Sequence, residues 1–226
     1  MLKLAPILIA LLYGVVMYRL SASRMAKQLD QNSKPLSDPL LNQLTKQMAV
    51  ALEIPRIKVN IYEVEQVNGL AAPDGRIFIT RGFFNKYKNG EVTAEELAGV
   101  IAHELGHVAL GHSRRRMIDF SGQNAMRTAL AMILNRFLPG VGGFVANFLG
   151  TLLVARLSRN DEYEADAYAA ALLTKAGIGT APQISLFEKL NKLSGANGAA
   201  TPAWMLSHPK TTQRIAAIKD MENRWS

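Results

Sequence analysis

The run from His103 to His107, His-Glu-Leu-Gly-His, has the residue types of a metal site at the spacing of one helical turn. Positions i and i+4 lie on one face of an α-helix, so His103 and His107 can direct their imidazoles at one metal ion. Glu104 can then reach a water molecule on that ion without being a ligand itself. The pattern predicts a hydrolytic zinc site. There, zinc lowers the pKa of the water toward about 7, and Glu104 takes up its proton as it attacks a peptide carbonyl.

A catalytic zinc needs a third protein ligand and an open position for water. In one known zinc-protease motif the next histidine would fall at position 113, which is Ser113. His112 lies five residues after His107, which corresponds to roughly 140° round a helix. We therefore expect His112 to be a capping or surface histidine that points away from the metal.

A dense acidic cluster at residues 158–166 offers the missing ligand. Glu162 and Asp166 are one helical turn apart and share a face, whereas Glu164 points away from both. We expect Glu162 to be the third ligand and Asp166 to accept a hydrogen bond from the ring N–H of a ligand histidine. Arg159 is expected to support this helix by pairing with Asp166 or Glu162. The alternative is a solvated acidic helix start, which the helix dipole would favour.

Helices must carry most of these residues. Residues 93–96, Thr-Ala-Glu-Glu, are a capping-box pattern, and the helix that they start should run to about Met117 with both histidines inside it. Further helices are expected over residues 40–52, 161–175, 182–193 and 209–224. The alternation over residues 56–62 and the apolar run at 77–80, which follows a turn signal, predict a small sheet. The expected fold is α+β and predominantly helical.

Composition excludes several other kinds of site. The chain of 226 residues has no cysteine, so neither a disulfide framework nor a cysteine-based zinc site is possible. Lys and Arg exceed Asp and Glu by 8, from 26 and 18 residues, but no basic stripe is interleaved with aromatic residues. Nucleic acid is therefore not an expected partner, and an anionic membrane surface fits the charge better.

The amino-terminal segment is the best candidate for a contact with membrane lipid. Residues 4–18 are uncharged and strongly apolar, with Lys3 before them and Arg19 after them. This is short for a spanning helix of about 20 residues, although snorkelling basic side chains extend its reach. It also fits a signal-peptide core, and the alternative is a buried core helix. We expect a membrane anchor or signal segment over 1–20, a linker over 21–39 and a zinc metallopeptidase domain over 40–226.

A second uncharged stretch covers residues 137–155. It contains Pro139 and four glycines, which argue against a single membrane span. We expect a hydrophobic helical hairpin packed on the domain.

Several motifs, in order along the chain, resemble those of the HtpX-like and CAAX-prenyl-protease-like family of membrane-associated gluzincin metallopeptidases. They are the run at 68–82, residues 103–107 with Gly111-His112, Ser158-Arg159 with Glu162-Tyr163-x-Ala165-Asp166, and Ser207-His208-Pro209 with Arg214-Ile215. They span about two thirds of the chain. The resemblance implies a zincin-type domain whose edge strand lies beside the zinc helix. It also implies one Zn²⁺ ion held by His103, His107 and Glu162, with Glu104 as catalytic base.

The resemblance further implies a substrate site and another active-site residue. A substrate strand would lie against the edge formed by residues 76–80, since such β-augmentation reads backbone hydrogen bonds. The residues expected to contact it are Asn68, Arg76, Ile77, Phe78 and Ile79. In relatives, a histidine from the region of His208 approaches the metal and either stabilises the oxyanion or occupies the open zinc position. The alternative for His208 is a structural residue before Pro209 at a helix start.

Two hypotheses of function follow. The first is a zinc metalloendopeptidase that hydrolyses peptide bonds in misfolded or membrane-associated proteins. The second is a catalytically latent or non-catalytic, zinc-bound chaperone-like module that binds unfolded segments on the edge strand. Glu104 argues against a purely structural zinc site, which would need no base. Compact relatives with a single leader segment favour the extracytoplasmic (periplasmic) face of a membrane.

Overall fold

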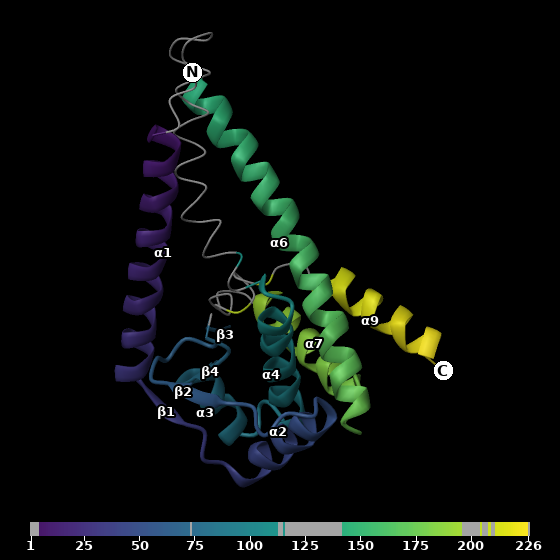
Figure 1. Ribbon diagram of the computed structural model, residues 1–226. Helices are drawn as coiled ribbons and strands as arrows, with labels where there is room; N and C mark the ends of the chain where they lie inside the picture. Colours follow the sequence, from purple (N-terminus) through teal and green to yellow (C-terminus); the bar gives the residue numbers. More distant parts are fainter. Residues whose placement is uncertain are drawn as a thin grey trace.

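The structure is a computed structural model that describes residues 5–72, 74–112, 115, 142–195, 204, 208 and 211–225. Figure 1 shows its elements, which are α1 (Ala5–Gln31), β1 (Ser33–Pro35), α2 (Pro39–Ala51), β2 (Val59–Tyr62), β3 (Gly69–Ala71), β4 (Ile77–Thr80), α3 (Arg81–Lys88), α4 (Ala94–Ala109), α6 (Gly142–Lys175), α7 (Ala181–Gly195) and α9 (Thr211–Trp225). The described part is mostly helical with a small mixed sheet, as the sequence predicts.

The four-stranded sheet has the order β1-β2-β4-β3. Strands β2 and β4 are parallel, with Val59 opposite Ile77, and the two outer strands pair antiparallel with their neighbours. Strand β4 is therefore an inner strand. The prediction that residues 76–80 form the edge beside the zinc helix is wrong, because the edge on that side is β3.

The burial of the strands shows why β4 is an inner strand and why β3, the edge strand, is hard to recognise in the sequence. Every residue of β4 is buried, and a continuous apolar run is typical of an inner strand that is covered on both faces. Strand β3 is the short run Gly-Leu-Ala, which shows no alternation. A Cβ atom on Gly69 would lie 2.9 Å from Val100 Cγ1 and 3.3 Å from Glu104 Oε1. Glycine at this position lets the sheet edge approach helix α4 beside Glu104.

Helix α4 begins as predicted and ends earlier. The Thr93 hydroxyl accepts from the backbone N–H of Glu96, and the Glu96 carboxylate accepts from the backbone N–H of Thr93, which forms the expected capping box. The helix ends at Ala109, short of the predicted end near residue 117. Gly111 adopts a φ of 73°, a left-handed conformation that glycine favours and that commonly ends a helix.

Helix α6 is continuous from Gly142 to Lys175. The predicted hairpin is therefore wrong for residues 142–155, and residues 137–141 lie outside the described part. Glycine weakens a helix by only about 1 kcal/mol per residue, so the glycines here do not force a turn. Figure 1 shows the amino-terminal half of α6 extending from the same side of the domain as α1.

The amino-terminal helix α1 continues through Gln31, so residues 21–31 are helical where a linker was expected. The next residues form β1, which pairs with β2, and Arg76 beside β4 forms an ion pair with Asp30 at the end of α1. These contacts join the segment to the sheet. Within the described part of the chain, no helix is both long and apolar enough to cross a membrane.

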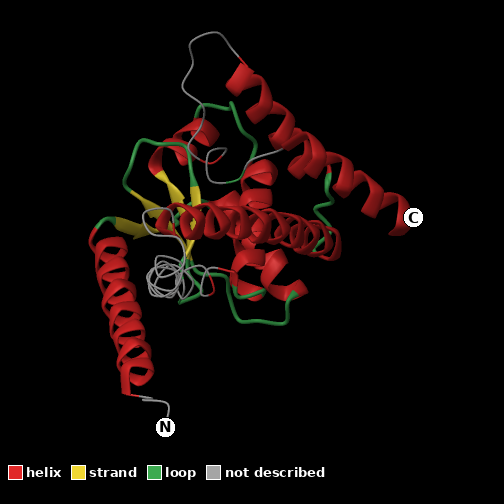
Figure 2. Cartoon of the chain, turned by 90° about the horizontal axis from the view of Figure 1, so that it is seen from above, coloured by secondary structure: helices red, strands yellow, loops and turns green. Residues whose placement is uncertain are grey.

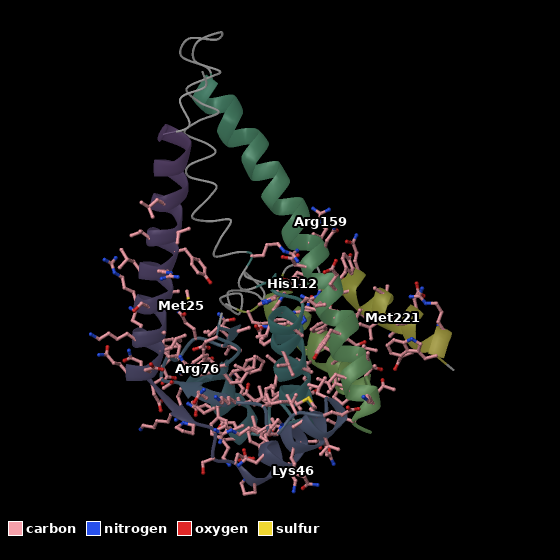
Figure 3. All side chains as sticks on the ribbon, in the orientation of Figure 1. Met25, Lys46, Arg76, His112, Arg159 and Met221 are labelled. Carbon is pink, nitrogen blue, oxygen red and sulfur yellow. The ribbon has the colours of Figure 1, made fainter. Side chains whose placement is uncertain are left out.

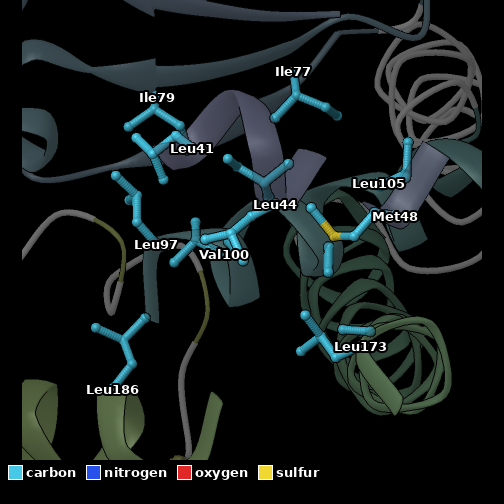
Figure 4. Close-up of a cluster of buried hydrophobic side chains, with 14 of the residues drawn as sticks. Leu41, Leu44, Met48, Ile77, Ile79, Leu97, Val100, Leu105, Leu173 and Leu186 are labelled. Carbon is cyan, nitrogen blue, oxygen red and sulfur yellow. The ribbon is translucent and has the colours of Figure 1, made fainter. Parts of the chain in front are cut away.

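Helix α4 packs against α2, α6 and α7 and against strands β3 and β4. The strands, yellow in Figure 2, lie to one side of the central helices. Figure 4 shows the buried side chains that surround α4, including Leu41, Leu44, Met48, Ile77, Ile79, Leu97, Val100, Leu105, Leu173 and Leu186. A Cβ atom on Gly106 would lie 3.0 Å from both Cα and O of Ala165. Gly106 thus allows the close contact between α4 and α6 that brings Glu162 to the histidines.

Candidate metal site

Three segments of the chain bring buried polar side chains to one place. Helix α4 contributes His103, Glu104 and His107, helix α6 contributes Glu162, and His208 comes from the segment before α9. One potential ligand atom from each of the three histidines and from Glu162 lies within 4.8 Å of the others. Residues that are far apart in the sequence therefore form one compact donor set.

Glu162 lies between the imidazole rings of this donor set. Its Oε2 atom is 3.5 Å from His103 Nε2 and 3.9 Å from His208 Nε2, and its Oε1 atom is 3.5 Å from His107 Nε2. These separations exceed those of ordinary N–H···O hydrogen bonds. The buried His103 Nε2 makes no hydrogen bond to any described residue.

This donor set fits a zinc ion. Imidazole nitrogens and a carboxylate oxygen are usual zinc ligands, and the site contains them without sulfur. An imidazole nitrogen buried without a hydrogen bond, as at His103, is costly unless a ligand satisfies it. The residues present are therefore suited to hold the metal that the sequence predicts.

His103 is held from behind by a cluster of buried polar side chains. Its Nδ1 donates to Asp166 Oδ1 at 2.9 Å because a carboxylate only accepts, and this contact directs Nε2 toward Glu162 and the site. Arg214 Nε and Nη2 donate to Asp166 Oδ2 and Oδ1 at 2.5 and 2.7 Å. Gln183 Nε2 adds a donor to Oδ1 at 3.4 Å. Asp166 therefore accepts the ring N–H of His103, as predicted from its position one turn after Glu162.

The charges in this cluster shift the pKa values of its members. Burial disfavours a charged His103, but Asp166 and Glu162 outweigh it and raise the pKa of its ring to about 9. Burial opposes ionisation of Glu162 as well, yet the contacts with His103 and His107 hold its pKa far below the usual range. Arg214 likewise lowers the pKa of Asp166 against the effect of burial. Burial moves the pKa of His208 well below its ordinary value, which disfavours the charged form of this ring.

His107 is held by a different partner. Its Nδ1 lies 3.0 Å from His112 Nδ1, and His112 Nε2 lies 3.0 Å from Glu164 Oε2 and 3.7 Å from Asp161 Oδ1. His112 is fully buried, so the prediction of a capping or surface histidine that points away is wrong. The helical projection fails because α4 has ended and Gly111 turns the chain back. Figure 3 shows His112 at this end of α4, beside α6.

His208 faces Glu104 across the site, with its Nε2 3.7 Å from Glu104 Oε1. Its Nδ1 donates to the backbone oxygen of Trp204 at 3.1 Å, and the two rings stack with centroids 4.9 Å apart. Arg214 Nη1 donates to the His208 backbone oxygen at 3.2 Å. The backbone N–H of Trp204 donates to the backbone oxygen of Val67, a residue just before β3, at 3.0 Å. His208 is thus fixed to both the sheet edge and the Asp166 cluster.

Arg159 does not take the place that the sequence suggested. It is exposed on α6 (Figure 3). Arg214 from α9 pairs instead with both Asp166 and Glu162. The sequence shows Arg214 only as part of a motif. Arg214 could have been predicted from the sequence by the argument that two buried carboxylates require a buried cation beside them.

The residues predicted to line a substrate strand have other partners. Ile77, Phe78 and Ile79 are buried in the inner strand β4, whose two sides pair with β2 and β3. Arg76 binds Asp74 through its side chain. The prediction that a substrate pairs with residues 76–80 is therefore wrong, because those backbone groups are already used.

A helix with two histidines one turn apart, a glutamate from a second helix and a neighbouring sheet edge together define the metallopeptidase class of domain. The chain belongs to peptidase family M48, whose profile matches residues 35–222. This confirms the family that the sequence motifs resemble.

Several relatives of this chain carry protease names. The chain is 33% identical over 172 residues to Metalloprotease LoiP of Escherichia coli (strain K12), which covers 73% of this chain and 62% of that protein. It is 30% identical over 164 residues to Metalloprotease YcaL of the same strain, covering 73% and 61%. A Protease HtpX homolog of Salinibacter ruber (strain DSM 13855 / M31) is 28% identical over 220 residues, covering 82% and 75%. The chain thus spans about three fifths of the length of LoiP and YcaL.

Proposed function

We propose that this chain is a zinc-dependent metalloendopeptidase. The observation that carries the proposal is the convergence of His103, His107 and Glu162 from two helices, with Glu104 beside them. Membership of family M48 and metalloprotease relatives support it. His103, His107 and Glu162 would hold the ion, which supplies a Lewis acid that polarises the substrate carbonyl and lowers the pKa of a water molecule.

Glu104 is the proposed general base. It is buried on α4 next to Gly69 of the edge strand, so it lies between the donor set and the sheet edge. A carboxylate in this position can accept the proton of the attacking water and deliver it to the leaving amine. Burial strengthens its electrostatic interactions with the reacting groups because the local dielectric is low.

The proposed substrate site is the free edge of β3. Asn68 O accepts from Thr80 N, and Ala72 N donates to Arg76 O, so these residues face β4. Hydrogen-bonded and non-bonded positions alternate along an antiparallel pair, so the N–H and C=O of Ala71 face the free edge. A substrate that pairs with this edge as an additional strand would be bound mainly through its backbone hydrogen bonds. This mode suits unfolded or misfolded proteins, the substrates expected from the sequence.

The direct test is cleavage of unfolded casein by the full chain. Wild type and Glu104→Gln should both bind one zinc ion per chain, as measured by elemental analysis, and only the wild type should cleave. A chelator should abolish the cleavage and added zinc should restore it. A wild-type protein that binds no zinc, or a Glu104→Gln variant that cleaves normally, would contradict the proposal.

A latent form of the enzyme is the second candidate, and the hydrogen bond of His208 favours it. Because Nδ1 donates to the Trp204 oxygen, the Nε2 atom of the neutral ring carries a lone pair. It would therefore act as a fourth ligand more readily than as a donor to an oxyanion, and four protein ligands would close the site. Higher casein cleavage by His208→Ala would support latency, whereas loss of cleavage with zinc retained would support the oxyanion role.

We also propose that α1 associates with a membrane surface. Its exposed apolar side chains include Leu12, Val15, Val16 and Leu20. Arg19, Arg24 and Lys27 of the same helix add positive charge. Such a segment can lie in the interface of an anionic bilayer. The full chain should float with vesicles that contain phosphatidylglycerol, and Leu12→Ser with Val16→Ser should reduce flotation. The periplasmic face remains a prediction.

A further inference from the structure

We infer that His112 is a positioning residue that fixes the ring of His107 with its Nε2 lone pair toward the zinc site. The inference rests on the proposed function, in which His107 is a ligand. It follows from three side chains in a row, each within hydrogen-bond distance of the next. These are His107, His112 and Glu164, with separations of 3.0 Å for both pairs.

The direction of these hydrogen bonds follows from the two ends of the row. Glu164 is a carboxylate and can only accept, so His112 Nε2 must carry the ring proton. As a zinc ligand, His107 must keep the lone pair of Nε2, so its Nδ1 is the donor of the 3.0 Å contact and His112 Nδ1 is the acceptor. His107 therefore carries its proton on Nδ1, and its Nε2 lone pair faces Glu162 Oε1. The opposite tautomer of His107 would place a proton where a cation must bind.

The fold supplies the means to place His112 behind His107. Gly111, at a φ of 73°, reverses the chain after α4, and His112 ends fully buried against α6. The ring nitrogens of a metal-ligating histidine usually need such an outer partner to fix tautomer and orientation. A histidine can serve here because its two nitrogens carry opposite hydrogen-bonding roles.

His112 and Glu164, together with Asp161, also have the donor atoms of a second cation site. The surrounding charges favour the hydrogen-bond assignment. Arg115 Nη1 already lies 3.5 Å from Asp161 Oδ1, so a cation occupies one side of that carboxylate. Glu164 is 57% exposed, which makes it a solvated acceptor and a poor member of an enclosed site.

The test compares two substitutions at His112 in the full chain. His112→Leu removes the acceptor, whereas His112→Asn keeps an amide oxygen near the position of Nδ1. Zinc affinity, measured by competition with a chromophoric chelator, should fall about 10- to 100-fold in His112→Leu and recover most of that loss in His112→Asn. Equal zinc affinity of wild type and His112→Leu would overturn the inference. It would also be overturned if His112→Leu and His112→Asn lost zinc affinity equally while unfolding at the same temperature.

A second measurement needs no substitution. Long-range ¹H–¹⁵N spectra of the chelator-treated, folded wild type should show His107 protonated on Nδ1, and an Nε2-protonated ring would overturn the inference. Zinc stoichiometry separates the remaining outcomes. Two ions per wild-type chain would replace the inference with a second metal site, and no zinc bound by wild type would refute the proposed function itself. Zinc bound normally by every His112 variant would refute only the role of His112.

Discussion

The two imidazoles of the zinc helix are held by opposite kinds of partner. His103 is backed by Asp166, which is buried and clamped by the buried Arg214. His107 is backed by His112, which passes its hydrogen bond to the half-exposed Glu164. One side of the site is therefore a charged cluster sealed in the core, and the other is a chain of hydrogen bonds that opens to solvent.

This difference predicts how substitutions on each side affect stability and zinc binding. In the sealed cluster, the loss of one charge leaves another charge buried without its partner. On the open side, water can replace a lost acceptor, so a change at the outer end should have a small effect. The first side should govern stability together with zinc binding, and the second should govern zinc binding more selectively.

The largest effect is expected from Arg214→Met. The substitution leaves Asp166 buried without its cation, and removal of one partner of a buried ion pair costs about 3–5 kcal/mol. Urea unfolding of the chelator-treated protein measures this loss. The matched control is Arg115→Ala on the open side, which pairs with Asp161 while 52% exposed and should cost at most about 1 kcal/mol. Equal losses in the two variants would remove the distinction between the two sides.

A smaller effect on zinc binding should distinguish the two outer carboxylates. Asp166→Asn weakens the acceptor for His103 and leaves Glu162 as the remaining anion beside Arg214, so zinc affinity should fall about 10- to 100-fold. Glu164→Gln keeps an amide oxygen that can accept from His112 and should bind zinc within about threefold of wild type. Chelator competition on both variants provides the comparison. If Glu164→Gln bound zinc as weakly as Asp166→Asn, solvent would not be compensating for changes on the open side.

Two glycines with left-handed backbone conformations provide a further test of the open side of the site. Gly111 and Gly90 have φ values of 73° and 76°, and a Cβ atom on either would meet nothing within 4 Å. Alanine should therefore cost roughly 1–2 kcal/mol at each position through backbone strain alone. Only Gly111→Ala should also weaken zinc binding, because Gly111 places His112 behind His107. Thermal unfolding and zinc titration of both variants test this, and normal zinc affinity in Gly111→Ala would count against the role of the turn.

The smallest effect concerns acid sensitivity at the start of α4, away from either side of the site. Burial opposes ionisation of Glu96, but hydrogen bonds from Lys189, Ser185 and the Thr93 N–H outweigh it, so its pKa lies below the ordinary value of 4.5. A lowered folded pKa contributes stability above the unfolded pKa, and this stability is lost as pH falls through the folded value. Urea unfolding between pH 6 and 3 should therefore show a smaller decline in Glu96→Gln, by about 1 kcal/mol. An identical pH dependence in wild type and variant would contradict the assignment.

Local rules predicted several parts of the molecule. The capping box at Thr93 and the strand at residues 77–80 are observed as expected, because short-range hydrogen bonds and apolar patterning decide them. The same rules misjudged the sheet edge, since β3 is a strand only through its pairing with β4. They also misplaced His112, because helical projection does not extend past Gly111.

The sequence by itself determined the pair His103 and His107 with Glu104 between them, because the pitch of a helix fixes the relative directions of residues one turn apart. The acidic cluster also suggested Glu162 and Asp166, but the tertiary structure alone decided how these and other distant groups reach that pair. Glu162 reaches the helix because α6 packs against α4, where Gly106 permits the close approach, and Arg214 comes from α9, which packs against α6 and α7. His208 comes from the segment before α9. Such contacts depend on how whole elements pack, and no local sequence pattern encodes that geometry.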